Sequence, residues 1–174
     1  IYDGVRLGQA AGGRMVRFRH NSAASLDRAL SKLKGEQAAL VMTDGVFSAE
    51  GDIAKLDELT AVVEQRGARL FVDDAHALGV IGPGGRGTAH HFGLERKVDM
   101  IGGTFSKSLA SVGGYLVGER KVLDYIGHFA PSFMFAASGA PSSIAAAMAA
   151  FDVMQEETWR IDTLRENYTY MKNE

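Results

Sequence analysis

Apolar and polar positions follow two rhythms along this chain, one typical of helices and the other typical of buried strands. Apolar residues spaced three and four apart, such as Leu26, Leu30 and Leu33, predict amphipathic helices. We expect helices at residues 25–34, 56–65, 119–129, 142–156 and 158–171, and the end of another within residues 1–13. Short apolar runs bounded by polar residues or glycine predict strands at residues 15–18, 38–42, 68–72, 98–104 and 115–117.

The order of these elements predicts the fold class. Strands that alternate with helices of about ten residues are typical of βαβ units, whose right-handed crossovers build a parallel sheet. We therefore expect an α/β domain with a mainly parallel sheet sandwiched by helices. Ligands of such sheets bind at the carboxyl ends of the strands. Three polar clusters follow expected strands, at residues 43–52, 73–76 and 104–107, and we expect them to face one crevice.

One lysine, Lys107, interrupts an otherwise uncharged stretch at residues 100–118. An ammonium group is costly to bury, so a lysine in such surroundings is usually solvated, paired or covalently engaged. A desolvated lysine amine is a nucleophile toward aldehydes. This stretch alone favours a solvated loop lysine, and the covalent role needs support from the rest of the chain.

Other candidate side chains lie at the ends of expected strands. Asp73 directly follows a strand and His76 comes three residues later, a pair that suits a metal, an oriented base or a protonated ring nitrogen. A helix cap and a hydrogen-bonded histidine are the alternative. Thr104 and Ser106 flank Lys107 with hydroxyls, which bind phosphate together with backbone N–H groups or simply shape a turn.

Three further motifs have simpler interpretations. Residues 82–87, GPGGRG, lack the Lys-Ser/Thr ending of a P-loop and the spacing of a dinucleotide fingerprint, so we expect a flexible connection. His90 and His91 are adjacent, which is typical of a solvated loop pair, and we expect no metal site. His20 is interpreted as a packing residue.

Composition narrows the functional classes. The 174 residues are enough for one domain with a core, and the net charge of −2 argues against nucleic acid or an anionic membrane surface as a partner. No apolar run is long enough to span a membrane. The absence of cysteine excludes disulfides and thiolate metal sites and is compatible with a reducing cytoplasm. Because the chain opens on Ile1 and ends in a charged helical stretch, we expect a piece of a longer protein.

Four ordered stretches resemble the α-oxoamine synthase family of pyridoxal 5'-phosphate enzymes. They are VRFRHN from Val16, TDGVFSAEGDIAKLDEL from Thr43, FVDDAHALGVIGPGGRG from Phe71 and GGTFSKSLASVGGYLVG from Gly102. The resemblance covers essentially the whole chain, and the ordered set is specific to the family. It implies the large domain of the fold-type I, aspartate aminotransferase-like fold. Residues 1–174 would then be part of the cofactor-binding domain, with residues 142–174 leading toward a carboxy-terminal domain outside this chain.

The resemblance also implies roles for single residues. Lys107 resembles the lysine that holds the cofactor covalently. Asp73 resembles the carboxylate beside the pyridine nitrogen, which it keeps protonated so that the ring accepts electrons. His76 resembles the histidine near the cofactor's phenolic oxygen, implicated in substrate binding and proton handling.

The remaining implied contacts come from hydroxyl groups. Ser48 stands where the family has a hydroxyl that reaches the phenolic oxygen. Thr104 resembles a phosphate ligand, and Ser106 is a further candidate for the same task. With Lys107, Asp73 and His76 these residues make up the expected cofactor site.

The activity implied by the resemblance is a decarboxylative, Claisen-type condensation of an amino acid with an acyl-CoA to give an aminoketone. The GTFSKS run resembles the branch that uses L-serine and a long-chain acyl-CoA more than branches with a GTLGKA-type run. The alternatives are the branches that form 8-amino-7-oxononanoate or 2-amino-3-ketobutyrate, a true aminotransferase, or a non-catalytic fragment or partner subunit. The family implies a cytoplasmic homodimer, because its active sites lie between two subunits.

Overall fold

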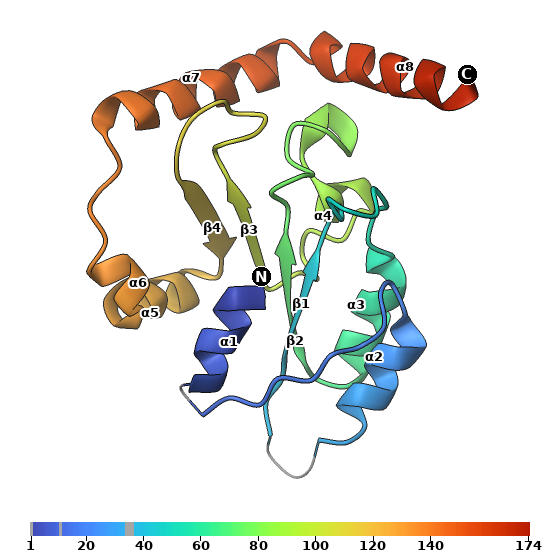
Figure 1. Cartoon of the computed structure of the whole chain (residues 1–174), viewed down its shortest axis with the longest axis vertical. Helices are drawn as coiled ribbons and strands as arrows, with labels where there is room; N and C mark the ends of the chain where they lie inside the picture. Colours follow the sequence, from blue (N-terminus) through green and yellow to red (C-terminus); the bar gives the residue numbers. More distant parts are fainter. Residues whose placement is uncertain (1, 11, 34–36) are drawn as a thin grey trace.

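The computed structural model describes residues 2–10, 12–33 and 37–174 of the chain. Helices and strands alternate over its first two thirds, and helices fill the last third (Figure 1). In chain order the elements are α1 (Tyr2–Ala10), α2 (Ala23–Leu30), β1 (Leu40–Asp44), α3 (Leu56–Gln65), β2 (Arg69–Asp73), the 3₁₀ turn η1 (Pro83–Gly85), α4 (Thr88–His91), β3 (Met100–Thr104), β4 (Gly114–Gly118), α5 (Arg120–Phe129), α6 (Pro131–Met134), α7 (Pro141–Glu156) and α8 (Trp159–Asn173).

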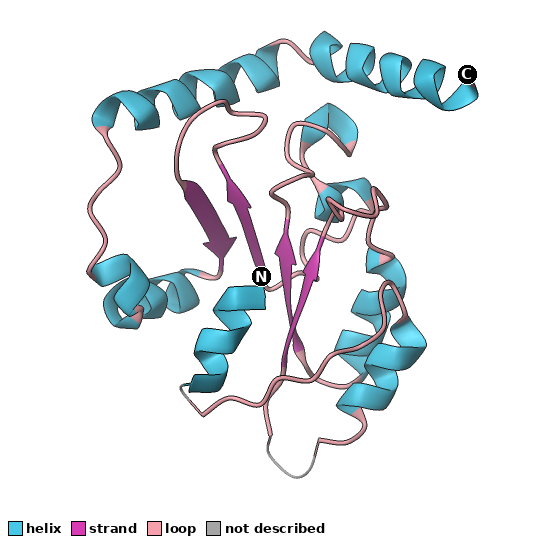
Figure 2. Cartoon of the chain, in the orientation of Figure 1, coloured by secondary structure: helices cyan, strands magenta, loops and turns pink. Residues whose placement is uncertain are grey.

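The sheet has the strand order β1-β2-β3-β4. Strands β1, β2 and β3 are parallel neighbours, whereas β4 pairs antiparallel with β3. The connection between β3 and β4, residues 105–113, is shorter than the dozen or more residues that a parallel crossover needs, so β4 returns alongside β3. The predicted α/β class with a mainly parallel sheet is confirmed, and helices flank the sheet (Figure 2).

The hydrophobic core lies on the face of the sheet that α2 and α3 cover. Alternate strand positions, including Val41, Leu70 and Val72, are buried against these helices. Spacings of three and four residues along α3 put its apolar side chains on the same face. The helix residues of this core are Leu26, Leu30, Leu56, Leu59 and Val63. Full burial of one such side chain stabilises the fold by about 1.5–3 kcal/mol.

Helix α2 has a defined start. The side chain of Ser22 accepts a hydrogen bond from the Ser25 amide and so caps the helix, as expected of a serine at this position. The helix ends at Leu30, earlier than predicted, and residue 34 lies outside the described residues.

The predicted strand at residues 15–18 is wrong. This segment has no regular secondary structure. A strand requires a neighbouring strand that accepts and donates its backbone hydrogen bonds, and within the described sheet the two edges β1 and β4 pair only with β2 and β3.

The last third of the chain is helical. Helix α7 runs past the loop that joins β3 to β4, and α8 continues beyond it to the carboxyl end of the chain (Figure 1). These helices contact the glycine-rich turn at residues 79–87. A Cβ atom added to Gly85 would lie 2.6 Å from Ile161 Cδ1 of α8. Gly85 itself is buried, so the segment predicted as a flexible connection is a packed turn. No helix in the described ranges is both long and apolar enough to cross a membrane.

Candidate active site

Polar side chains end three neighbouring parallel strands at the same edge of the sheet. Asp44 ends β1, Asp73 ends β2 and Thr104 ends β3. The strand register pairs Asp44 with Asp73, and Asp73 with Gly102. The three polar clusters therefore begin along one edge of the sheet, and the single crevice that they are expected to face stays a prediction. This is the edge where parallel α/β sheets bind ligands.

Asp44, Asp73 and His76 interact electrostatically at this edge. Partial burial raises the pKa of Asp44, the neighbouring carboxylate of Asp73 raises it further, and the charge of His76 opposes both effects. The Asp73 carboxylate accepts a hydrogen bond from the Ala75 amide at 3.0 Å, which closes the turn leading to His76. Sequence reasoning missed Asp44 as an individual site residue. Only the β1–β2 register brings it beside Asp73, and no local signal reveals that register.

A third carboxylate, that of Asp74, is buried beside the site. Its side chain is 2% exposed, and Oδ2 accepts a hydrogen bond from the Thr88 amide at 2.9 Å. Its Oδ1 atom has no hydrogen-bond partner among the described residues, and burial raises the pKa of this carboxyl group. Added Cβ atoms at Gly45 and Gly87 would lie 2.1 and 2.2 Å from its oxygens. Glycine at both positions therefore makes room for the carboxylate.

Lys107 stands on the loop between β3 and β4, residues 105–113. Burial and hydrogen bonds fix this loop: Leu109 is 3% exposed, the Ser108 hydroxyl donates to the Leu78 carbonyl at 2.7 Å, and the Ser111 hydroxyl donates to the Ser143 carbonyl at 2.6 Å. Lys107 itself is exposed, and within the described ranges no carboxylate forms an ion pair with it. A fixed backbone therefore presents a solvent-accessible amine.

Thr104 and Ser106 form a pair of hydroxyls next to Lys107. Their side-chain oxygens are 2.8 Å apart, and the Thr104 hydroxyl reaches the Gly113 carbonyl at 3.0 Å. The Ser106 amide donates to the Thr104 oxygen at 3.2 Å. Hydroxyls and amide groups gathered at one turn are suited to an anion such as phosphate.

Tyr115 of β4 adds a phenol to the same region. Its ring stacks on Phe105 with centroids 5.9 Å apart. Burial raises the pKa of Tyr115 to about 12, and the carboxylates of Asp74 and Asp73 contribute to the increase. A Cβ atom at Gly103 would lie 2.5 Å from the phenol oxygen, so glycine on β3 leaves the space that the ring occupies.

The structure brings some predicted site residues together and leaves others apart. Asp73 and His76 share the neighbourhood of Asp44, and Thr104 contacts Ser106 directly. Ser48 lies on an exposed turn after β1. In the part of the chain that the structure describes, no hydrogen bond joins Ser48 to these residues.

The two adjacent histidines belong to a different environment. His90 and His91 lie on the short helix α4 rather than in a loop, and His90 pairs with Glu95. Across residues 2–10, 12–33 and 37–174, no group of three or more histidine, aspartate or glutamate side chains is placed to hold a metal ion.

Comparison with known proteins identifies similar sequences over the whole chain. A family model described as aminotransferase class I and II matches residues 5–174. Serine palmitoyltransferase of Sphingobacterium spiritivorum is 47% identical over 174 residues, which cover 100% of this chain and 43% of that protein. 8-Amino-7-oxononanoate synthase 1 of Bacillus subtilis is 41% identical over 172 residues, which cover 99% of this chain and 43% of that protein. The chain spans less than half the length of these relatives.

A solved structure extends this similarity to three dimensions. Serine palmitoyltransferase from S. paucimobilis with a bound PLP–myriocin aldimine matches with a TM-score of 0.85 at 39% sequence identity. The match covers 89% of this chain and 39% of that chain. The arrangement of strands and helices described above is therefore shared with that protein.

Proposed function

We propose that this chain, which belongs to the aminotransferase class I and II family and within it to the α-oxoamine synthases, is the pyridoxal-phosphate-binding part of a C-acyltransferase. Its mainly parallel α/β fold is that of the large domain of fold-type I enzymes. One observation carries the proposal. Asp73 and His76 stand at the carboxyl edge of β2, while the loop after the neighbouring strand β3 presents the amine of Lys107.

The proposed reaction joins L-serine to a long-chain acyl-CoA. A carbon–carbon bond forms between the α-carbon of the amino acid and the acyl carbonyl carbon. The carbon–sulfur bond of the thioester breaks, CoA leaves, and the carboxylate of the amino acid departs as carbon dioxide. The product is an aminoketone, a step that belongs to sphingolipid biosynthesis. The 47% identity to a serine palmitoyltransferase and the GTFSKS run support this choice of substrates.

The side chains at the carboxyl edge fit pyridoxal phosphate by their chemistry. When bound, this cofactor supplies an electron sink for negative charge at the α-carbon. The Asp73 carboxylate would lie beside the pyridine nitrogen and keep it protonated. The Lys107 amine would hold the cofactor covalently, and as a free amine it would move the proton at the α-carbon of the amino acid.

The remaining roles belong to hydroxyls and an imidazole. Thr104 and Ser106, whose oxygens are 2.8 Å apart, would hold the cofactor's phosphate. Ser48 would donate a hydrogen bond to the phenolic oxygen. His76 would hold a proton near the same oxygen and orient the amino acid.

A second candidate function is 8-amino-7-oxononanoate synthase, and the 41% identity to such an enzyme favours it. It would use the same residues with a different amino acid and acyl group, as would a 2-amino-3-ketobutyrate CoA ligase. A true aminotransferase would use Lys107 and Asp73 but would release a keto acid and no CoA. A non-catalytic partner subunit would have no use for Lys107.

We further propose that the protein acts as a cytoplasmic homodimer. The surface of α5 and α6 supports a dimer, because three large aromatic side chains on these helices remain more than 60% exposed. They are Tyr125, Phe129 and Phe133. Exposed apolar patches of this kind are typical of interaction surfaces.

Covalent trapping tests the cofactor site. The chain is incubated with pyridoxal phosphate, reduced with borohydride and digested, and the labelled peptide is mapped. We expect a pyridoxyl group on Lys107 and none at that peptide in Lys107→Ala, with Lys121→Ala on exposed α5 as the matched control. Labels scattered over other lysines would contradict the assignment.

The substrates are then separated by CoA release. L-serine, L-alanine and glycine are each combined with palmitoyl-CoA, pimeloyl-CoA and acetyl-CoA. CoA release with serine and palmitoyl-CoA supports the first function, and release with alanine and pimeloyl-CoA supports the second. Keto-acid formation without CoA release would overturn both.

A further inference from the structure

Ser48 lies on a small hairpin that follows β1, residues 46–53. Val46 and Ile53 form an antiparallel bridge at its base. The Phe47 amide donates to the Asp52 carbonyl at 2.9 Å, and the Gly51 amide donates to the Phe47 carbonyl at 2.8 Å. These bonds define the hairpin's shape without attaching it to the rest of the fold.

The tip of the hairpin has no core of its own. Residues 48–51 are exposed, and the nearest fully buried side chain beyond them is Ala54. An exposed turn of four residues is normally among the more mobile parts of a domain. The orientation of Ser48 therefore depends on contacts at the base of the hairpin.

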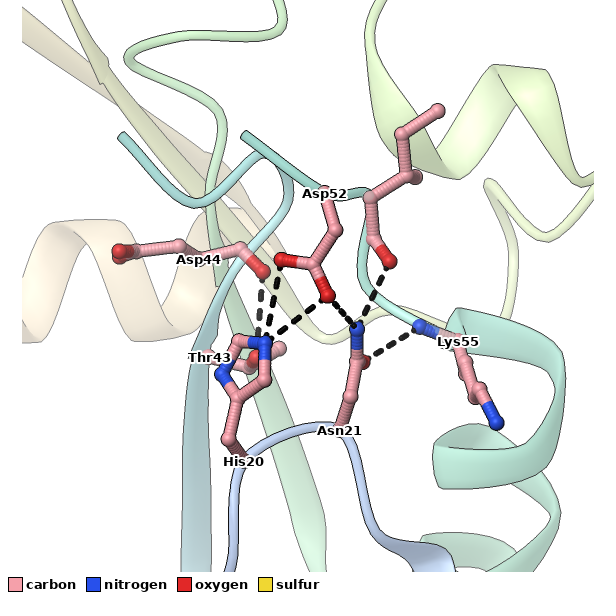
Figure 3. Close-up of polar contacts among 7 residues, drawn as sticks. His20, Asn21, Thr43, Asp44, Asp52 and Lys55 are labelled. Carbon is pink, nitrogen blue, oxygen red and sulfur yellow. Dashed lines mark hydrogen bonds and ion pairs between the residues drawn. The ribbon is translucent and has the colours of Figure 1, made fainter. Parts of the chain in front are cut away.

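Two side chains from the segment before α2, His20 and Asn21, form hydrogen bonds with the base of the hairpin (Figure 3). The His20 Nε2–H group donates to the Asp52 carboxylate at 2.9 Å, and Asn21 Nδ2 donates to the same carboxylate at 2.8 Å. The His20 ring also packs edge-on against Phe47, with centroids 4.3 Å apart. The hydrogen bond from His20 lowers the pKa of Asp52 below its ordinary value. The expectation that His20 only packs is therefore corrected: it also binds a carboxylate.

Asn21 also forms hydrogen bonds with the backbone on both sides of Ala54. Its Nδ2 donates to the Ile53 carbonyl at 2.9 Å, and its Oδ1 accepts from the Lys55 amide at 2.8 Å (Figure 3). Asn21 has φ +49°, in the left-handed region that asparagine tolerates better than most residues. One side chain thus binds two groups of the hairpin, at Asp52 and Ile53, and the amide of Lys55 just beyond it.

The segment that carries His20 and Asn21 is itself fixed to helix α2. Directly after Asn21, Ser22 caps α2, and the Arg19 amide donates to the Ser25 hydroxyl at 3.0 Å. Helix α2 is anchored in the core through Leu26, which is 2% exposed. The contacts therefore connect the hairpin to a packed helix rather than to another surface loop.

We propose that His20 and Asn21, acting through Asp52, are positioning residues that hold Ser48 where its hydroxyl meets the phenolic oxygen of pyridoxal phosphate. This inference rests on the proposed role of Ser48. The role of His20 and Asn21 would be to orient Ser48 and not to bind the cofactor. Without them the hairpin's internal hydrogen bonds open more often, and Ser48 loses its fixed direction relative to β1.

The first test measures the hairpin without any ligand. In the variants Asn21→Gly and His20→Phe we expect faster hydrogen exchange at the Phe47 and Gly51 amides, with exchange in the core strand β2 unchanged. Asn21→Gly keeps the positive φ free of strain, and His20→Phe keeps the aromatic contact with Phe47. Lys55→Ala is the matched control, because it keeps the amide that Asn21 binds. Unchanged exchange in both variants would overturn the proposal.

The second test measures whether the contacts of Asn21 affect cofactor binding through Ser48. One hydrogen bond of the Ser48 hydroxyl predicts about a threefold to tenfold weaker binding of pyridoxal phosphate in Ser48→Ala. We expect Asn21→Gly to weaken binding by a similar factor alone, and to have no further effect in the Ser48→Ala background. Full additivity would show that Asn21 does not act through Ser48 and would overturn the proposal.

The two tests separate the two hypotheses. If pyridoxal phosphate does not label Lys107 in the parent chain, the proposed function fails. Hydrogen exchange still decides whether His20 and Asn21 restrict the motion of the hairpin. If the parent chain is labelled and the double-mutant cycle is additive, the proposed function stands and the positioning role of His20 and Asn21 is refuted.

Discussion

The two halves of the described chain differ in how they bury apolar surface. Residues 23–104 contribute every member of the main hydrophobic cluster, from Leu26 to Ala89. Residues 112–173 contain four helices, yet Ala147 and Ile161 are the buried apolar residues that this part of the structure describes. Most large apolar side chains of these helices remain exposed, as Phe135 does at 84%.

The second half shows that a segment can form a predicted helix without burying its apolar side chains. Helices α5, α7 and α8 form where their sequence predicts them, although most of their large apolar side chains stay exposed among the described residues. In residues 23–104, by contrast, each helix is matched by a strand face that buries it, and stability comes from that match. The first half supplies the rigid frame of the proposed site. The second half contributes Ile161, which packs against Gly85 of that frame, and Ser143, whose carbonyl accepts a hydrogen bond from Ser111 of the Lys107 loop.

The largest expected effect comes from deleting the same side chain in each half. Leu59 on α3 is 0% exposed, whereas Leu164 on α8 is 44% exposed. Leu59→Ala should reduce the free energy of unfolding by about 2–5 kcal/mol, because it removes buried apolar contacts and leaves a cavity. Leu164→Ala should change it by less than about 0.5 kcal/mol. Urea denaturation followed by circular dichroism measures both.

A large loss in Leu164→Ala would break the comparison. It would mean that α8 is buried in solution against another molecule, since this chain leaves that side chain open. Repeating the measurement over a range of protein concentrations would then show whether a second copy covers it, because association makes apparent stability depend on concentration.

A smaller effect is expected from adding one methyl group in each half. Gly45→Ala would place a Cβ atom 2.1 Å from oxygens of both Asp74 and Thr88, so the surroundings must shift. We expect a loss of about 1–3 kcal/mol in the free energy of unfolding. Gly127→Ala on α5 meets nothing within 4 Å and should be neutral or stabilise by up to about 1 kcal/mol.

Thermal unfolding of the two glycine variants measures this contrast. Equal losses in Gly45→Ala and Gly127→Ala would show that the tight fit around Asp74 does not distinguish the two halves. A loss confined to Gly45→Ala would locate the strain-sensitive packing directly beside the candidate site.

The elements that the sequence predicted best are those with a strong local pattern. Helix α3 begins and ends at the predicted residues, because Leu56, Leu59 and Val63 repeat at helical spacing and are all buried. The segment predicted as a strand at residues 15–18 also had a local pattern, typical of a strand, but it has no neighbouring strand to pair with in the described sheet. Strand pairing depends on distant segments, which an alternating pattern does not reveal.

The candidate site shows the same division. Asp73 was a candidate because it directly follows an apolar strand, and Lys107 because it is the single charge in a long uncharged stretch. The predicted role of each came from the resemblance to the α-oxoamine synthases. Asp44 and the contact between His20 and Asp52 were missed. Both join segments about thirty residues apart, and they follow from strand register and from the position of α2 rather than from spacing.

The smallest expected effect is a change in the pH dependence of stability. Burial raises the pKa of Asp74 above its ordinary value of 3.8, so the folded chain holds this proton to higher pH than the unfolded chain. Stability from this group is therefore fully present below about pH 3.8 and is lost as pH rises through the folded-state pKa. Asp74→Asn keeps the size and an acceptor oxygen for the Thr88 amide, so its stability relative to the parent should rise from pH 4 toward pH 7. Asp152→Asn on exposed α7 makes the same change in net charge, and its urea-denaturation profile should run parallel to the parent's. If the Asp74→Asn profile also ran parallel to the parent's, the buried carboxyl group of the first half would not couple folding to pH.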